Sequence, residues 1–220
     1  MSDKVMQGFD VLQQDFHNDP ARTAIIALHW QNDVVTPKGA FGSTFADAVS
    51  QSGVIERTAK LIDGARNAGC LIIFVNIVYR PGYSGIVQNN ALFRRAVTSE
   101  GFITHTPGAA IIDKLQPFAG DIVIDHARSS AFFGSDLLTI LIGNGIRTVA
   151  IGGIATNVAV DHTARDAMQY GFDTVLLEDC CFSSDIEHHR AALVTLRVLC
   201  SAVITGAGFL NALGPSRPAR

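Results

Sequence analysis

Two histidines lie at the ends of apolar runs, and an imidazole is the side chain best suited to moving protons near neutral pH. His29 lies in the run 23–30, and His126 directly follows the run 121–125. Because the reference pKa of an imidazole is about 6.5, each ring can donate or accept a proton without a large shift. If the fold brings the rings together, we expect like-charge repulsion to leave them one shared proton. Such a pair could catalyse hydrolysis by water, enol-ether protonation or a proton shift.

Further polar and aromatic side chains near the ends of these runs are candidates for binding a ligand. Arg80 and Arg128 could each clamp a carboxylate, although a surface or inter-subunit salt bridge is the other interpretation. Trp30 could form a pocket wall or pack in the core. His188 and His189 lie on an amphipathic stretch, and we expect them on its solvated face.

A metal site is an alternative use of the two histidines. His29 and His126 together with Asp33 would make the two-histidine, one-carboxylate set that binds iron or zinc. The residue types alone do not separate this alternative from acid–base chemistry.

Short apolar runs alternate with amphipathic stretches, which indicates a parallel α/β fold. The runs are nearly continuous and rich in β-branched residues, as in strands that are covered on both faces. The runs are 23–30, 70–79, 121–125, 148–154 and 174–179, and the amphipathic stretches are 54–68, 87–99, 134–144, 156–170 and 185–199. Gly69, Gly145 and Gly171 stand where helices should end. The pattern predicts a three-layer α/β/α sandwich with a mostly parallel, Rossmann-like sheet.

Strand position alone predicts where a ligand should bind. In an open parallel sheet, ligands lie beyond the carboxyl ends of the strands. This rule selects the segments 29–33, 79–80, 126–128 and 154–157.

Length and composition fit one globular domain with a small-molecule ligand. We expect an N-terminal arm over 1–22, the α/β domain over 23–205 and a C-terminal tail over 206–220. Lys and Arg number 17 against 20 Asp and Glu, so we expect neither nucleic acid nor membrane as a partner. The chain shows no signal-peptide layout, and its four cysteines lack CxxC spacing. We therefore expect buried free thiols and a cytoplasmic location.

Three segments carry a resemblance to a known family. They are ALHWQND (27–33), DIVIDHARSSAFFGSDL (121–137) and the block 152–167, GGIATNVAVDHTARDA. In this order and combination they resemble the isochorismatase-like cysteine hydrolases. The resemblance implies the same α/β fold and places the active site at the three segments.

The resemblance also implies that the family's usual chemistry cannot operate. Ala159 stands where the family has its nucleophilic cysteine, and His29 and His126 stand where it has an aspartate and a lysine. A methyl group cannot attack a carbonyl, so covalent acyl transfer at position 159 is excluded. The isochorismatases proper also lack the cysteine, but they generally keep the other two residues.

Other expectations follow from the same resemblance. The turn at Ile154 and Ala155 resembles one with a cis peptide bond that directs backbone N–H groups at an oxyanion. His162, three residues after Ala159, could line the pocket. Nicotinamidases of this superfamily bind a metal through an Asp and His cluster after the first strand. Residues 34–44 contain no such cluster, so we expect no metal and no cofactor. Because members of the family commonly form dimers or tetramers, the resemblance also implies a homo-oligomer.

Three functions are compatible with these features. The first is a cysteine-independent hydrolase of a small metabolite that is anionic or bears an amide, with His29 and His126 as acid and base. The second is a decayed enzyme that serves as a scaffold or ligand-binding subunit, and the third is a lyase or isomerase at the same site. Both catalytic positions carry an ionisable histidine in place of the family's residue, and this favours an enzyme. Loss of catalytic function would instead predict arbitrary residues at these positions. An open cavity that both imidazoles face would favour an enzyme, whereas a filled one would favour decay.

Overall fold

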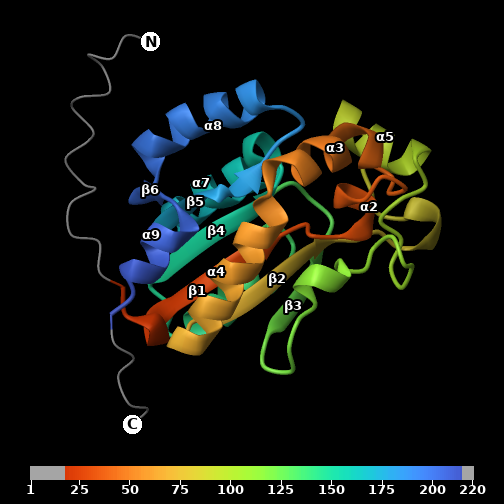
Figure 1. Cartoon of the computed structure of the whole chain (residues 1–220). Coiled ribbons are helices and arrows are strands. Elements are labelled where there is room, and N and C mark those ends of the chain that lie inside the picture. Colours follow the sequence, from red (N-terminus) through yellow and green to blue (C-terminus); the bar gives the residue numbers. More distant parts are fainter. Residues whose placement is uncertain (1–17, 215–220) are drawn as a thin grey trace.

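Six parallel strands form one sheet in the computed structural model of the chain, which describes residues 18–214 (Figure 1). Along the sheet the strand order is β3-β2-β1-β4-β5-β6. The strands are β1 (Thr23–Leu28), β2 (Leu71–Ile77), β3 (Ile122–His126), β4 (Thr148–Ile154), β5 (Asp173–Phe182) and β6 (Ala202–Ile204). This is the strand order of the Rossmann fold, and it reverses direction between β1 and β4. The predicted fold class is therefore confirmed, and the sheet is entirely parallel.

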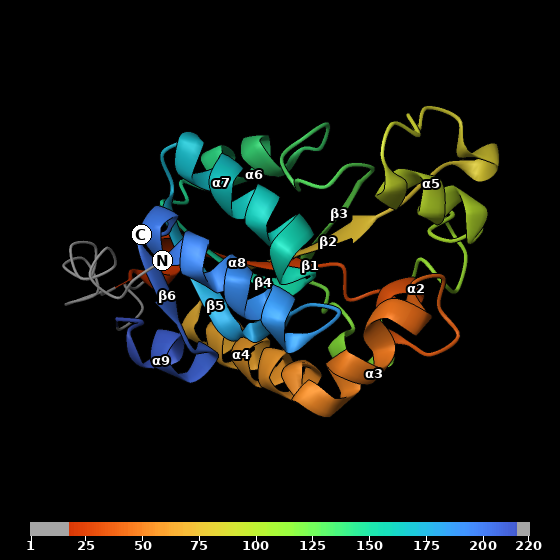
Figure 2. The ribbon, with the colours of Figure 1, turned by 90° about the horizontal axis from the view of Figure 1, so that it is seen from above.

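Helices cover both faces of the sheet and complete the three layers (Figure 2). Helices α4 (Val54–Ala68) and α9 (Gly206–Asn211) lie on one face. On the other face lie α6 (Leu137–Gly143), α7 (Asp161–Gln169) and α8 (Ile186–Leu199). Helices α2 (Asn32–Val35), α3 (Gly42–Ser52) and α5 (Ala91–Thr98) lie beyond the carboxyl ends of the strands. The described residues also form short turns: η2 (Pro20–Arg22), η3 (Pro81–Tyr83), η4 (Asp113–Leu115) and the π-helical turn η5 (Thr156–Val160).

The central strand β1 explains why the apolar runs are nearly continuous. Ile25 and Ala27 pack into the core under α4, whereas Ile26 and Leu28 pack into the core under α6 and α7. Successive side chains point to opposite faces of a strand, and both faces here are covered. Every residue of β1 is therefore buried.

Helix α4 begins and ends at the residues that the amphipathic pattern predicted. Its buried stripe includes Leu61, Ile62 and Ala65. Gly69 ends it in the left-handed region, at φ 94°, and its N–H donates to the carbonyl of Arg66. A residue with a Cβ is disfavoured in this conformation, which explains the glycine. Gly145 and Gly171 also have positive φ, so the three predicted helix stops are confirmed.

The packed domain continues past the boundary that we predicted at residue 205. Helix α9 follows β6, and its Phe209 is completely buried in the core under α4. The Gly206 N–H also donates to the Asp179 carboxylate at 2.7 Å. Of the predicted tail, only residues 215–220 lie outside the described part of the chain, as do residues 1–17 of the predicted arm.

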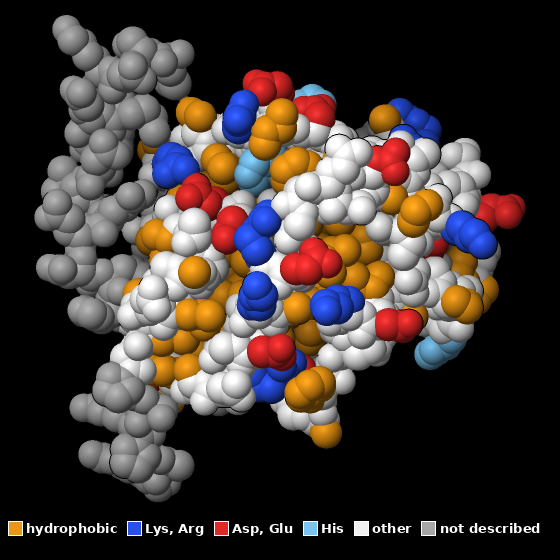
Figure 3. All heavy atoms as spheres, in the orientation of Figure 1, with side chains coloured by type: hydrophobic (Ala, Val, Ile, Leu, Met, Phe, Trp, Pro, Cys, Tyr) orange, Lys and Arg blue, Asp and Glu red, His pale blue; other side chains and the backbone are white. Residues whose placement is uncertain are grey.

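The surface mixes charged and apolar side chains. On the face seen in Figure 3, positive and negative groups alternate over the described residues and do not gather by sign. Within residues 18–214, no helix combines the length and the apolar character that a bilayer crossing requires.

Candidate functional site

The fold brings His29 and His126 into direct contact. His29 follows β1, His126 is the last residue of β3, and β2 lies between these two strands. The two Nε2 atoms are 2.8 Å apart, and the rings stack with centroids 5.1 Å apart. His29 has a φ of 59°, in the left-handed region, which turns the chain directly after the strand. Residues other than glycine rarely adopt this conformation, and those that do concentrate at functional sites.

Burial favours the neutral form of both imidazoles, which corrects our expectation of unshifted pKa values. Burial, and then repulsion from His126, lower the pKa of His29 well below its usual 6.5, while a hydrogen bond to the backbone of Ile154 acts in the opposite direction. Burial also lowers the pKa of His126 to about 4, against a hydrogen bond to the backbone of Ser130. Each ring therefore carries one proton, on one of its two nitrogens.

The hydrogen bonds of His126 indicate which nitrogens carry those protons. Its Nδ1 lies 3.1 Å from the carbonyl oxygen of Ser130, which can only accept. Nδ1 of the neutral ring therefore donates, which leaves Nε2 of His126 able to accept a hydrogen bond from His29.

A cavity of about 60 Å³ lies beside His29, at the point where the strand order reverses between β1 and β4. This is where the Rossmann order predicts a ligand. Ile154 and Ala155, joined by a cis peptide bond, form one wall together with Ala159 from the π-helical turn η5. The remaining lining residues are Val34, Phe41, Phe45, Ile77, Tyr79, Leu92, Ala96, Phe102, Ser129 and Val158. One imidazole of the pair, His29, lines the cavity, and His126 lies behind it.

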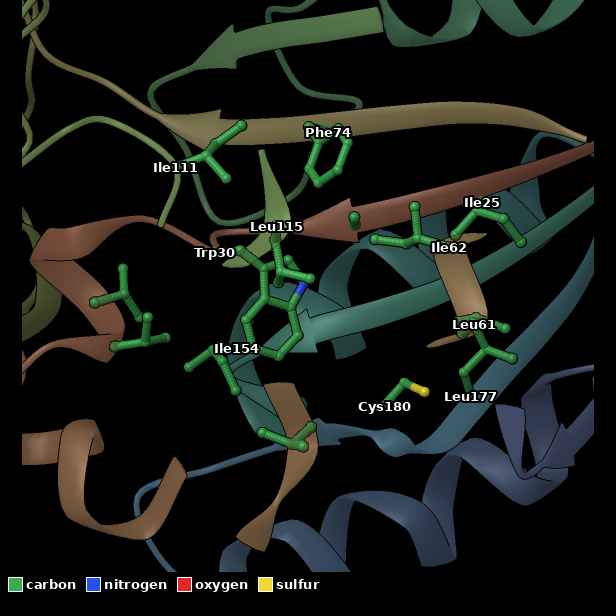
Figure 4. Packing of buried hydrophobic residues seen from close by; sticks show 14 of the residues in the cluster. Ile25, Trp30, Leu61, Ile62, Phe74, Ile111, Leu115, Ile154, Leu177 and Cys180 are labelled. Carbon is green, nitrogen blue, oxygen red and sulfur yellow. The ribbon is translucent and has the colours of Figure 1, made fainter. Parts of the chain in front are cut away.

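Trp30 packs in the core and does not line the cavity, which corrects its assignment to substrate binding. Its side chain lies among Leu115, Ile111 and Ile154 (Figure 4). Only 1% of the residue is exposed.

The Asp33 carboxylate binds backbone N–H groups and does not line the cavity, although it lies in the segment 29–33 that strand position selected for ligand binding. Its carboxylate accepts hydrogen bonds from the N–H of Phe102 at 2.6 Å and of Ala40 at 3.2 Å. A Cβ at Gly108 would lie 2.4 Å from this carboxylate, so only glycine fits beside it. Asp33 therefore holds the loop that carries Phe102, a wall of the cavity. Among the described residues, no three His, Cys, Asp or Glu side chains come together as metal ligands.

The predicted pocket residues Arg128 and His162 lie outside the cavity, in a neighbouring hollow that shares Ser129 with it. The Arg128 guanidinium lies 5.6 Å from the centre of the Phe93 ring. The carbonyl of Val158 lies 2.7 Å from Nδ1 of His162. Arg80 is exposed at the start of η3 and does not line the cavity. All three side chains therefore lie outside the cavity, contrary to our prediction. The strand-end rule predicts which segments lie near a ligand, but it does not predict which way their side chains point.

His189 is buried, contrary to our prediction of a solvated residue. It is 7% exposed, and its Nδ1 lies 2.8 Å from Oγ1 of Thr156, the first residue of η5. The signal was present in the sequence: His189, Leu193 and Leu196 share the buried stripe of α8. His188 is exposed, as predicted.

Several cavity residues were missed by reasoning from the sequence. Phe41 and Phe102 come from loops, where no periodic pattern identifies a buried side chain. Tyr79 belongs to a segment that the strand-end rule selected, although we gave it no role. Its position after the carboxyl end of β2 was therefore the one feature of the sequence that could have identified Tyr79 as a cavity residue.

A family model and curated relatives match the chain over most of its length. Residues 23–208 match the isochorismatase domain. The ureidoacrylate amidohydrolase RutB of Acinetobacter baylyi is 31% identical over 205 residues, which cover 87% of this chain and 84% of the relative. The maleamate amidohydrolase of Pseudomonas putida is 30% identical over 151 residues, which cover 69% of this chain and 70% of the relative.

A solved structure shows the same fold at lower sequence identity. A cysteine hydrolase from Pseudomonas syringae pv. phaseolicola superposes with a TM-score of 0.81 at 23% identity. The match covers 89% of this chain and 93% of the other.

Proposed function

The chain belongs to the isochorismatase family, and we propose that it is a hydrolase of a small, amide-bearing metabolite that works without a cysteine nucleophile. The observation that carries this proposal is the 2.8 Å contact between His29 and His126 beside a cavity that Ala159 lines. The hydrolase class is supported by the relatives, which are named as amidohydrolases.

Water takes the place of the thiol in this proposal. Ala159 offers only a methyl group at the cavity, and none of the described residues that line it is a cysteine. The four thiols are free, and burial raises the pKa of Cys181, for example, well above its usual value. A thiol is nucleophilic only as the thiolate, so these groups are inert near neutral pH.

His29 is the general base, and His126 is the residue that positions it. His29 takes a proton from water as the water oxygen bonds to the amide carbonyl carbon. The same proton then passes to the leaving nitrogen as the C–N bond breaks, which releases a carboxylic acid and an amine or ammonia. His126 orients the imidazole of His29 through their Nε2 contact, as the third group of a catalytic triad does for its base.

Turnover of small amides by matched variants tests this function. Release of ammonia from a panel of short primary amides would be measured for the wild type, His29→Gln and His126→Gln. We expect a loss of about 100-fold or more in His29→Gln, because a positioned base contributes on that scale. We expect a smaller loss in His126→Gln. Equal turnover in all three folded proteins would refute the proposal.

A second candidate is binding of a small molecule without turnover. It is favoured by the cavity lining, in which the described residues include no carboxylate, thiol or cationic side chain. This candidate predicts that ligands bind to the wild type and to His29→Gln alike and that neither protein hydrolyses them.

We also propose that the chain acts in the cytoplasm as a homo-oligomer. The four free thiols support a reducing compartment. Val123 on the edge strand β3 and Phe133 beyond it are 47% and 66% exposed, which supports a contact between copies. Light scattering on the purified chain would give its mass, and a monomer at micromolar concentration would contradict the oligomer.

A further inference from the structure

Arg128 is a partly buried cation for which the described part of the chain supplies no anion. Between residues 18 and 214, no carboxylate forms a salt bridge with its guanidinium group. Its Nη1 atom is buried and has no hydrogen-bond partner among these residues. The guanidinium carbon lies 5.6 Å from the centre of the Phe93 ring, which gives a cation–π contact. A charge withdrawn from water without a counter-ion is costly, so the position of Arg128 calls for an explanation.

The Arg128 side chain lines a hollow of about 440 Å³ that adjoins the cavity beside His29. Ser129 lines both spaces, so the hollow and the cavity are neighbours. Burial raises the pKa of Tyr79, a residue of the cavity wall, to about 12, and the positive charge of Arg128 opposes this increase. The charge of Arg128 therefore acts at the cavity wall as well as in the hollow.

The cavity itself accommodates only a small group. A water molecule needs about 10–15 Å³ of such space, so the cavity of about 60 Å³ fits an amide group and little more. The rest of an amide-bearing molecule must then extend beyond the cavity. The hollow shares Ser129 with the cavity and offers the larger space.

The surroundings of the hollow contain charges of both signs. Asp166, from α7, lines the hollow and opposes an anion there. Asn90, the N-cap residue of α5, also lines it, so the hollow borders the N-terminal end of this helix, where the helix dipole favours negative charge. Arg128 and α5 thus attract an anion, and Asp166 provides a test of opposite sign.

We propose that the hollow is an anion subsite in which Arg128 binds the carboxylate of a ligand whose amide group occupies the cavity. This inference rests on the proposed function in taking the cavity as the amide site. It narrows the class of small, amide-bearing metabolites to those that also carry a carboxylate. A guanidinium group can bind both oxygens of a carboxylate through parallel hydrogen bonds, which would fix the orientation of the ligand.

Two probes of nearly the same shape test the charge of the ligand. Succinamate carries one amide and one carboxylate, whereas succinamide carries an amide at each end and no charge. Isothermal titration calorimetry would measure their binding to the full-length wild type. We expect succinamate to bind at least about tenfold more tightly. Equal affinities, tighter binding of succinamide, or no binding of either compound would overturn the inference.

Arg128→Gln tests the residue that provides the charge. We expect this variant to bind succinamate about tenfold more weakly than the wild type and to bind succinamide as the wild type does. Arg147→Gln is the matched control, because Arg147 is exposed directly before β4, at the amino end of that strand. It should keep the wild-type preference for succinamate. The same preference in Arg128→Gln would remove Arg128 from the site.

Asp166→Asn tests the subsite independently of Arg128, and so also covers the case in which Arg128→Gln does not fold. The variant removes the like charge from the hollow, so we expect about two- to fivefold tighter binding of succinamate and unchanged binding of succinamide. Unchanged or weaker binding of succinamate would contradict the inference.

Turnover separates this inference from the proposed function. A protein that binds succinamate through Arg128 but releases no ammonia from it would contradict only the proposed hydrolysis. A protein that hydrolyses succinamate and succinamide with equal kcat/KM would contradict only the anion subsite.

Discussion

The carboxylate of Asp33 binds the backbone N–H of Phe102, 69 positions away in the chain, at 2.6 Å. This hydrogen bond connects helix α2 to the loop that forms one cavity wall. Phe102 itself has a φ of 62°, so the loop holds it in a left-handed conformation. The shape of the cavity thus depends on a carboxylate that does not touch the ligand space.

Replacing Asp33 by Ala should therefore lower the free energy of unfolding and weaken ligand binding together. The variant leaves the buried N–H of Phe102 without an acceptor, which costs about 2 kcal/mol. Urea unfolding would measure the loss. Asp47→Ala, at an exposed position of α3, is the matched control and should unfold as the wild type does. An Asp33→Ala variant of unchanged stability would contradict this role.

Acid should destabilise the protein through the buried imidazoles. His126 binds a proton with a pKa of about 4 in the folded state and about 6.5 in the unfolded state, so the unfolded state binds more protons between these values. Stability is then complete above about pH 6.5 and falls as the pH drops to about 4, by about 3 kcal/mol for this residue. His29 adds a loss in the same direction, because its pKa is also lowered.

Urea unfolding across this pH range would measure the effect. His126→Gln should flatten the dependence, whereas His188→Gln, on an exposed side chain, should keep the wild-type slope. An equal slope in all three proteins would show that His126 is not buried as a neutral ring.

The native cysteines should resist alkylation, and a cysteine at position 159 should not. Burial raises the pKa of Cys70, Cys180 and Cys200 to about 12. Iodoacetamide, a small neutral amide, should therefore leave the folded wild type unmodified and label Ala159→Cys once, as read by mass spectrometry. The unfolded wild type should take up four labels. Rapid labelling of the folded wild type would contradict the burial of its thiols.

Phe209→Ala should destabilise the whole domain. The side chain is completely buried between α9 and the core under α4, and truncation of a buried phenylalanine costs about 3–5 kcal/mol. Thermal unfolding would reveal a single transition at a lower temperature. Leu210→Ala, on a partly buried neighbour, should cost less. A loss confined to local fraying would instead place the domain end before α9.

The sheet could be predicted because its strands carry an unmistakable pattern, and the exceptions have physical reasons. β1 and β4 are buried on both faces, so their sequences are continuous apolar runs. β6, which we did not predict, has only three residues, too few for such a run to stand out.

The sequence predicted only those parts of the site that directly follow a predicted strand. Strand position located His29 and His126 at the same edge of the sheet, but β2 separates their strands, so their 2.8 Å contact depends on the directions of the side chains. Which way a side chain points after a strand is decided by local turns, as the φ of 59° at His29 and the inward packing of Trp30 illustrate. The loop residues Phe41 and Phe102 are held at the cavity by hydrogen bonds of their backbone N–H groups. No pattern in the sequence predicts these hydrogen bonds.

The entirely parallel sheet has a consequence for biosynthesis. Two neighbouring parallel strands cannot be joined by a tight hairpin. Each pair can therefore form only after the long connection between its strands has been synthesised. β1 has β2 on one side and β4 on the other, and Thr23 pairs with Thr148. A nascent chain therefore cannot complete its central strand until β4 has left the ribosome. Fragments that stop before residue 148 should be inactive and exposed to proteases, and the full chain should fold slowly, as topologies with many distant contacts do.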